Sequence, residues 1–465
     1  MTIGGIVILL FHPQPLLPAT CYLQQSDAGS FLAAAQSSIM HDFRGTDMPV
    51  RQCHTETTGS FRIADLWSRW SRRLIPTAEL TTASAKRGLS ATASAHLNLA
   101  RGLAAAAVAF QHLRSLLFLD WPQTTVHSPL AAGFYCLAKF AHPAVMVFFV
   151  LSGFLVGSSG LRAVENRTWS FPRYLLHRFL RLEIVLVPAL LLGLLWDTIG
   201  SHVAGASGLY NGGWKLLVRS SHIDLGWRTL LGNAAFVQGF VVPTFGTNAA
   251  LWSLANEFWY YVLFGLLVTA SLGTTRLWLR FLAAALILAV AWFTGFGIMA
   301  LAPLWFLGLG IYMLPQMSIS DGRRRALLAS SMLLFVAFLG VTFGRPAPAW
   351  ALFHPLMVDL ATGVLFSFVL YAILHANPAP TGYRRVADWI AAPTYTLYAN
   401  HLPAMVFLLA WTGSRRAPTP VHCLELVGWF IVFWFYAYGL YLLFESRTKT
   451  IRNWIEPKLF PLAAR

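Results

Sequence analysis

Long apolar runs recur along most of this chain, and they restrict its fold more than any other feature. A run of about 20 apolar residues forms a helix long enough to cross the hydrocarbon core of a bilayer. We identify ten such runs, near residues 99–119, 137–157, 182–200, 252–273, 277–297, 299–316, 326–343, 352–375, 394–412 and 422–444. The sequence therefore predicts an all-α membrane protein, a bundle of about ten transmembrane helices.

The composition excludes an ordinary soluble enzyme. Of the 465 residues, 57% are hydrophobic and only 11% are charged, whereas soluble domains carry roughly 25% charged residues. The net charge of +16 does not indicate nucleic acid, because the basic residues stand in short clusters between apolar runs and form no basic–aromatic module. The expected surroundings are a lipid bilayer, with no nucleic-acid partner.

The distribution of Lys and Arg predicts the orientation, since cytoplasmic loops are enriched in both. Loops on one side carry twelve: Arg162, Arg167, Arg173, Arg178, Arg181, Arg276, Arg280, Arg323, Arg324, Arg325, Arg384 and Arg385. Loops on the other side carry six: Lys215, Arg219, Arg228, Arg345, Arg415 and Arg416. Both termini are therefore predicted to be cytoplasmic, in a multi-pass protein of the inner (plasma) membrane.

Three parts of the chain differ in composition. Residues 1–95 are rich in small polar residues, which predicts a weakly ordered cytoplasmic extension. Residues 96–446 form the membrane domain, and residues 447–465 are a basic cytoplasmic tail. The apolar run 230–243 is too short to span and contains glycine and proline, which favours a re-entrant or interfacial segment.

Ionisable residues inside the predicted spans are candidates for function, because charge in a bilayer is costly. Arg101 and His112 are eleven residues apart, close to three helical turns, so they share one helix face about 16 Å apart along the axis. The predicted orientation places Arg101 at the cytoplasmic mouth and His112 deep in the membrane. The structural alternative is a snorkelling arginine and a packed histidine.

Two later spans carry further polar residues. Glu257 lies near the outer end of the fourth span, and His401 precedes Pro403 in the ninth. An interface carboxylate and a packed helix partner are the alternatives. No Walker, GxGxxG, HExxH or GxSxG motif is present, and the histidine-x4-aspartate spacing of His354 and Asp359 is attributed to chance. The cysteines lack metal-binding spacing, so neither a metal site nor a tightly bound cofactor is predicted.

Four motifs occur in order: ARGLAAAAVAFQH (100–112), VFFVLSGFLVG (147–157), LWSLANEFWYY (251–261) and PTYTLYANHLP (393–403). Together they resemble acyltransferase family three, polytopic membrane O-acyltransferases that act on bacterial surface glycans, over about residues 96–456. The resemblance implies ten crossings and transfer of an acyl group, commonly acetyl, from cytoplasmic acyl-CoA to a sugar hydroxyl. The family's arginine–histidine signature falls on Arg101 and His112.

The resemblance and the residue chemistry together predict the site. His112 is the expected general base, since the pKa of histidine lies near neutral pH, and Glu257 is expected to orient a histidine or a sugar hydroxyl on the acceptor side. Arginine binds phosphate bidentately, so we expect the phosphates of CoA, as donor substrate, to bind Arg101, Arg178 and Arg181. Residues expected to bind substrate or support the site are Ser152, Gly153, Trp252, Ser253, Tyr395, Tyr398 and His401.

Some features depart from the family pattern or leave alternatives. The arginine-rich element is followed by Leu182 and Glu183 where the family usually has an early proline, and Asn98 stands near a usual aspartate position. A covalent acyl-enzyme on Ser152 is the less favoured mechanism. The alternative function is a secondary transporter of a sugar or lipid-linked intermediate, which shares the crossings and buried ionisable residues.

Overall fold

The structure is a computed structural model that describes residues 89–203, 209–210, 223–272, 275–315, 317, 319–343, 355–378 and 380–460. These residues belong to one compact unit, residues 88–465. Within the described ranges the chain is helical and contains no β-strand, as the sequence predicts. The expected extension 1–95 lies outside these ranges except for residues 89–95, most of which begin the first described helix.

Each of the ten predicted spans overlaps one helix. These helices are α3 (Ala91–Leu117), α5 (Ala141–Glu165), α6 (Phe171–Ser201), α8 (Trp252–Ser271), α9 (Leu277–Met299), α10 (Ala302–Met313), α11 (Asp321–Phe343), α13 (Pro355–Leu374), α15 (Thr394–Thr412) and α16 (Pro420–Leu443). Seven candidate spans are long and apolar enough to cross a membrane, and they contain α5, α6, α8, α9, α11, α13 and α16. The total of ten crossings stays a prediction for α3, α10 and α15, and α10 covers only about 18 Å.

In the described part of the chain, four short α-helices lie between or after the long ones. They are α4 (Pro129–Leu137), α7 (Trp227–Ala234), α14 (Thr381–Ala391) and α17 (Thr448–Leu459). The run 230–243 holds the end of α7 and a turn at the buried Phe236, whose ring stacks on that of Phe258 at 4.4 Å. The predicted basic tail contains α17, whose Glu456 accepts a hydrogen bond of 2.9 Å from His177 on α6.

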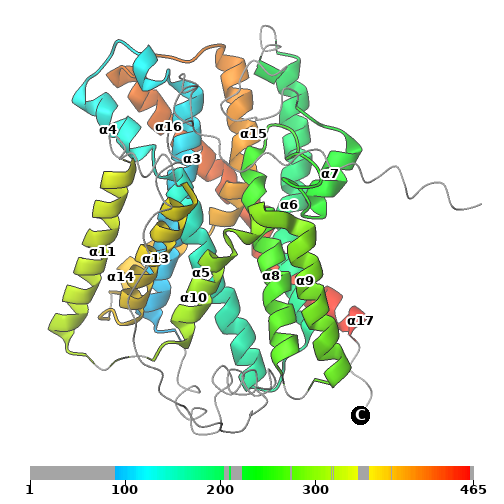
Figure 1. Cartoon of the computed structure of the whole chain (residues 1–465). Helices are drawn as coiled ribbons and strands as arrows, with labels where there is room; N and C mark the ends of the chain where they lie inside the picture. The colour runs from blue at the N-terminus through cyan, green and yellow to red at the C-terminus, as the bar shows by residue number, and fades with distance from the viewer. Residues whose placement is uncertain are drawn as a thin grey trace, which may run out of the picture. The chain divides into compact units, whose positions relative to one another are not determined.

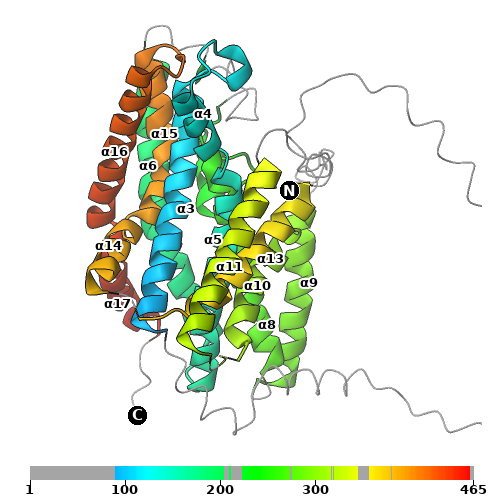
Figure 2. The same cartoon turned by 90° about the vertical axis from the view of Figure 1, so that its left-hand side faces the viewer.

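The long helices lie side by side, with α3 and α5 central (Figure 1). In the second view α15 and α16 lie on one side of these two helices, and α9, α10 and α11 lie on the other (Figure 2). Contacts within 8 Å join α3 to α5, α14 and α15, and join α5 to α8, α10 and α13. This arrangement brings residues from the first and ninth predicted spans together.

Glycines allow α5 and α10 to touch backbone to backbone. A Cβ atom at Gly153 would lie 1.7 Å from the carbonyl oxygen of Trp305, and one at Gly308 would lie 1.9 Å from that of Val150. Small residues at such crossings let helix backbones approach closely in a membrane. Gly153 therefore packs the two helices, and the close contact places the neighbouring Ser152 beside Trp305.

Candidate active site

Five helices, α3, α5, α6, α8 and α15, enclose a cavity of about 220 Å³. Its polar lining contains most of the residues expected from the sequence: Arg101, Ser152, Arg178, Arg181, Ser253, Glu257, Tyr395 and Tyr398. Tyr261 and Thr394 complete the polar lining, and aliphatic and phenylalanine side chains supply the rest. The cavity thus collects polar side chains from four separate motifs inside an apolar bundle.

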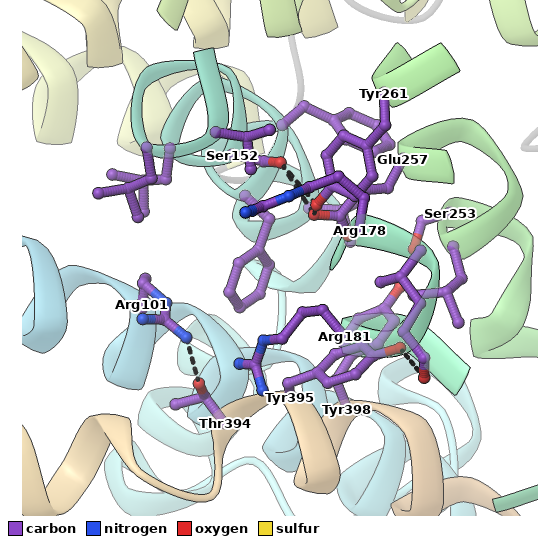
Figure 3. A pocket seen from close by; sticks show the side chains of 18 residues that line it. Arg101, Ser152, Arg178, Arg181, Ser253, Glu257, Tyr261, Thr394, Tyr395 and Tyr398 are labelled. Carbon is purple, nitrogen blue, oxygen red and sulfur yellow. Dashed lines mark hydrogen bonds between the residues drawn. The ribbon is translucent and has the colours of Figure 1, made fainter. Parts of the chain in front are cut away.

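Three arginine side chains line this cavity (Figure 3). Arg101 comes from α3, and its Nη2 lies 3.5 Å from the Thr394 hydroxyl of α15. Arg178 and Arg181 are three residues apart on α6, so they project from the same face. Three cations at one cavity form an environment that favours an anionic ligand.

The three arginines differ in their partners. Arg181 forms an ion pair of 2.6 Å with Glu445, whose carboxylate is buried. Among the described residues, neither Arg101 nor Arg178 has a carboxylate within 4.0 Å, and the buried Nε of Arg178 has no hydrogen-bond partner there. Arg101 and Arg178 are therefore the two guanidinium groups available to an incoming anion.

Glu445 connects the last long helix to this cavity. Besides Arg181, its carboxylate accepts hydrogen bonds from the backbone nitrogen (3.2 Å) and the hydroxyl (2.6 Å) of Thr396. The Arg181 guanidinium also lies over the ring of Tyr395 at 5.4 Å, and the Tyr395 hydroxyl donates to the Leu182 carbonyl oxygen at 3.0 Å. These contacts hold Arg181 and the start of α15 in place.

Glu257 forms the opposite part of the cavity wall. Its Oε1 accepts hydrogen bonds from the hydroxyls of Ser152, at 2.8 Å, and Tyr261, and the Trp305 indole donates to Ser152 at 3.2 Å. The sequence places Glu257 apart from the arginines, whereas the structure brings all of them to one cavity. The reason is that Ser152 lies three turns into α5 but Glu257 only about one and a half turns into α8, so α8 begins deeper in the bundle.

A pair of histidines lies beyond this cavity. His112 Nδ1 on α3 lies 2.7 Å from His401 Nε2 on α15, and the planes of the two rings are parallel to within 5°. His401 Nδ1 faces the carbonyl oxygens of Leu397, at 2.9 Å, and Tyr398, at 3.0 Å. His112 comes eleven positions after Arg101, and His401 comes seven positions after Thr394. These spacings alone give no sign that the two histidines meet.

The backbone carbonyls fix the hydrogens of this pair. A carbonyl oxygen only accepts, so His401 Nδ1 must carry a hydrogen, and Nε2 of the neutral ring is then an acceptor. His112 Nδ1 must therefore donate to it, which leaves the lone pair of the neutral His112 ring on Nε2. His401 is 1% exposed, so this orientation is protected from competing water.

Tyr398 lies between the cavity and the histidine pair. It lines the cavity, and its ring centroid is 6.3 Å from that of His401. Its hydroxyl donates to the Ala250 carbonyl oxygen at 3.0 Å and accepts from Ser253 at 2.6 Å. Four of the residues predicted from the sequence do not line the cavity: Gly153, Trp252 and the two histidines. The histidines form a separate pair next to it.

Besides Thr394, three contributors to the site were not expected from the sequence: Tyr261, Glu445 and Trp305. Tyr261 is four residues after Glu257, and this spacing on one helix face was a usable signal. Glu445 is a lone carboxylate at the end of an apolar run, which gave a weaker signal. Trp305 had no distinguishing signal, because its contact with Ser152 depends on the packing of α5 against α10.

Comparison with known proteins supplies one match. A family model described as an acyltransferase domain matches residues 95–445. The matched segment includes every residue of the cavity and the histidine pair. No curated protein and no solved structure matches the chain.

Proposed function

This chain belongs to acyltransferase family three, and we propose that it transfers an acyl group, acetyl in the first instance, from cytoplasmic acyl-CoA to a hydroxyl of a surface or exported carbohydrate. The proposed location is the inner (plasma) membrane, with both termini in the cytoplasm. His112 is the proposed general base. The observation that supports it most directly is the hydrogen-bond chain from two backbone carbonyls through His401 to His112.

That chain presents His112 as a base. Its Nε2 lone pair can take the proton of an acceptor hydroxyl while the hydroxyl oxygen attacks the thioester carbonyl carbon. The carbon–sulfur bond then breaks, the acyl group stays on the acceptor oxygen, and the CoA thiolate takes up the proton. His401 acts through His112, because its hydrogen bond keeps the same tautomer and stabilises the imidazolium that forms.

The donor is proposed to bind with its phosphates at Arg101 and Arg178. A pocket for a whole drug-sized ligand usually measures about 300–1,000 Å³, so the cavity of about 220 Å³ accommodates only part of acyl-CoA. Arg101 and His112 are about 16 Å apart along α3, and the flexible pantetheine arm links the phosphates to the thioester over a distance of that order. In this proposal the pantetheine arm passes Tyr398. Glu257 holds Ser152 and Tyr261 in place at the wall of the cavity.

Substitution of the two histidines tests this proposal. We expect His112→Ala to lower acetyl transfer by about 10²- to 10⁴-fold, the usual contribution of a general base. His401→Gln retains an oxygen that can accept from His112, so it should keep more activity than His401→Leu. The control is His202→Ala, since His202 is exposed and its hydrogen bonds within the described ranges are local, to Ser201 and the Thr198 carbonyl.

The measurement is transfer of radiolabelled acetyl from acetyl-CoA to polysaccharide isolated from the envelope of the source cells. Membranes are matched for the amount of each variant protein. If His112→Ala kept most of the wild-type activity, His112 could not be the general base, and the base would have to lie on another helix than α3. No transfer by the wild type, to polysaccharide or to the lipid fraction, would overturn the proposed function.

A further inference from the structure

A second histidine–carboxylate pair lies outside the cavity and the histidine pair. His142 Nε2, at the start of α5, lies 2.8 Å from Asp359 Oδ1 on α13. The His142 side chain is 52% exposed, and that of Asp359 is 11% exposed. In the sequence Asp359 follows His354 at the histidine-x4-aspartate spacing attributed above to chance. His354 lies outside the described residues, and in the structure Asp359 contacts His142.

The Asp359 carboxylate determines which ring nitrogen of His142 carries the hydrogen. A carboxylate only accepts, so Nε2 carries the hydrogen, and Nδ1 of the neutral ring keeps its lone pair. Within the described ranges no hydrogen bond to this Nδ1 is found. Ionisable residues in membrane helices face the bundle interior or water rather than lipid, so the exposed side of His142 faces an aqueous space.

This pair lies close to the histidine proposed as base. The backbone nitrogen of Ala141 donates to Gln111 Oε1 at 3.0 Å, and these two residues are the immediate chain neighbours of His142 and His112. Trp252, at the start of α8, lies on another side of His142, with ring centroids 6.5 Å apart and planes within 19°. Trp252 is partly exposed, so an indole and an exposed imidazole acceptor lie side by side, and the buried Asp359 carboxylate supports the imidazole from within.

We propose that His142, Asp359 and Trp252 form the binding site for the acceptor, and that the acceptor is a saccharide. A sugar has a C–H face that packs on an indole ring and hydroxyls that donate to a fixed acceptor. Here Trp252 takes the ring face, His142 Nδ1 accepts from a hydroxyl, and Asp359 is a positioning residue that holds the imidazole. The inference rests on the proposed function, because it places a neighbouring sugar hydroxyl near His112.

A fatty alcohol would fit this region less well. It has one hydroxyl and a long apolar chain. Either the polar groups of His142 and Asp359 or the apolar chain would then lack suitable contacts. The saccharide and the lipid alcohol are therefore tested as two separate acceptors. The probes are envelope polysaccharide and the total lipid extract of the source cells.

The kinetic arm measures acetyl transfer with acetyl-CoA and polysaccharide varied independently. We expect His142→Gln to raise KM for polysaccharide about 10-fold, the effect of losing one hydrogen bond, with KM for acetyl-CoA unchanged. Trp252→Leu should raise it about 2- to 10-fold through loss of an aromatic contact. Asp359→Asn should cost less than Asp359→Ala, because the asparagine oxygen still accepts from His142.

The control and a binding arm complete the experiment. Trp292→Leu alters a tryptophan on α9 that is 81% exposed, and it should change neither KM. The binding arm measures the affinity of the purified full chain for polysaccharide without acetyl-CoA, and we expect it to fall in His142→Gln and in Trp252→Leu.

The two arms separate the two hypotheses. Wild-type transfer together with unchanged polysaccharide affinity in both variants overturns the acceptor site. No polysaccharide binding by the wild type, or transfer only to the lipid extract, overturns the saccharide assignment. Polysaccharide binding that is lost in the variants, with no transfer by any protein, supports the site and overturns the proposed chemistry.

Discussion

Two arginines one helical turn apart on α6 have different surroundings, and this decides what each can do. Arg181 already neutralises the buried carboxylate of Glu445. Arg178 faces the same cavity with no carboxylate within 4.0 Å among the described residues. Arg178 is thus the residue whose charge is available to a ligand, while Arg181 is chiefly structural.

We predict that glutamine at Arg178 impairs acetyl-CoA binding, whereas glutamine at Arg181 impairs stability. Arg178→Gln should raise KM for acetyl-CoA about 10- to 150-fold, equivalent to one charged hydrogen bond of about 1.5–3 kcal/mol, at normal membrane abundance. Arg181→Gln leaves Glu445 buried without its partner, which typically costs about 3–5 kcal/mol of stability. Membrane abundance, thermal stability in detergent and acetyl-CoA kinetics are measured for both. An abundant, stable Arg181→Gln protein would contradict this distinction.

At this scale, most residues chosen from the sequence line one cavity, but the sequence did not show which of them meet. Spacing placed Arg101 and His112 on one face of a helix, and both are functional candidates in the structure. Only Arg101 lines the cavity, because three turns of α3 carry His112 past it to His401. Residue pairs such as His142 with Asp359 are 217 positions apart, and no local pattern specifies a contact over that separation.

At the scale of elements, the contact between α5 and α10 controls the wall of the cavity. Backbone atoms of the two helices meet at Gly153 and Gly308, and the Trp305 indole reaches Ser152 across this contact. The motif around Ser152 therefore has a packing reason for its glycine. A change that separates these helices should also disturb the hydrogen bond from Ser152 to Glu257.

Two glycines of α10 give a matched test. At Gly308 an added Cβ would lie 1.9 Å from the Val150 oxygen and 2.7 Å from the Phe154 nitrogen, whereas at Gly310 nothing lies within 4 Å. Gly308→Ala should lower stability by about 1–3 kcal/mol or more through overpacking, and it should reduce activity. Gly310→Ala should be neutral or slightly stabilising, since alanine favours helix. Equal melting temperatures for the two variants in detergent would contradict the packing.

Helix positions were largely accessible from the apolar runs, but helix lengths were less so. The ten predicted spans all fall on helices, yet α10 has only twelve residues, because Pro303 lies in its first turn and the helix ends at Met313. Amphipathic elements such as α14 and α17 were missed, since their apolar residues are too few to register as spans. Runs of high hydropathy predict membrane-spanning helices well, but they do not reveal short helices at the surface.

At the scale of the whole molecule, the predicted orientation rests on the basic loops rather than on any single contact. Arg323, Arg324 and Arg325 begin α11, and Arg384 and Arg385 lie on α14. Pro418 lies between α15 and α16, at the other end of α15 from Thr394. These positions are assigned to opposite sides of the membrane by the twelve-to-six difference in loop charge.

Reporter fusions test this assignment directly. A reporter that works only in the cytoplasm should be active when fused after Arg325 or after Arg385, because basic loops are retained in the cytoplasm. A reporter that works only outside the membrane should be active when fused at Pro418. A fusion at the end of the chain should also report the cytoplasm and serves as the internal control. Reversed signals at two sites would place Arg101 and Arg178 at the wrong membrane face for acyl-CoA.

The histidine pair has a consequence for the surroundings of the protein. Each member belongs to a different helix, so the tautomer of the base depends on the separation of α3 and α15 as well as on side-chain chemistry. Helices respond to bilayer thickness by tilting when their apolar length does not match it. A tilt of one helix against the other lengthens the 2.7 Å contact and frees His112 to change its tautomer. If His112 is the base that we propose, lipid composition is expected to change the fraction of molecules in which His112 holds the tautomer that can accept a proton.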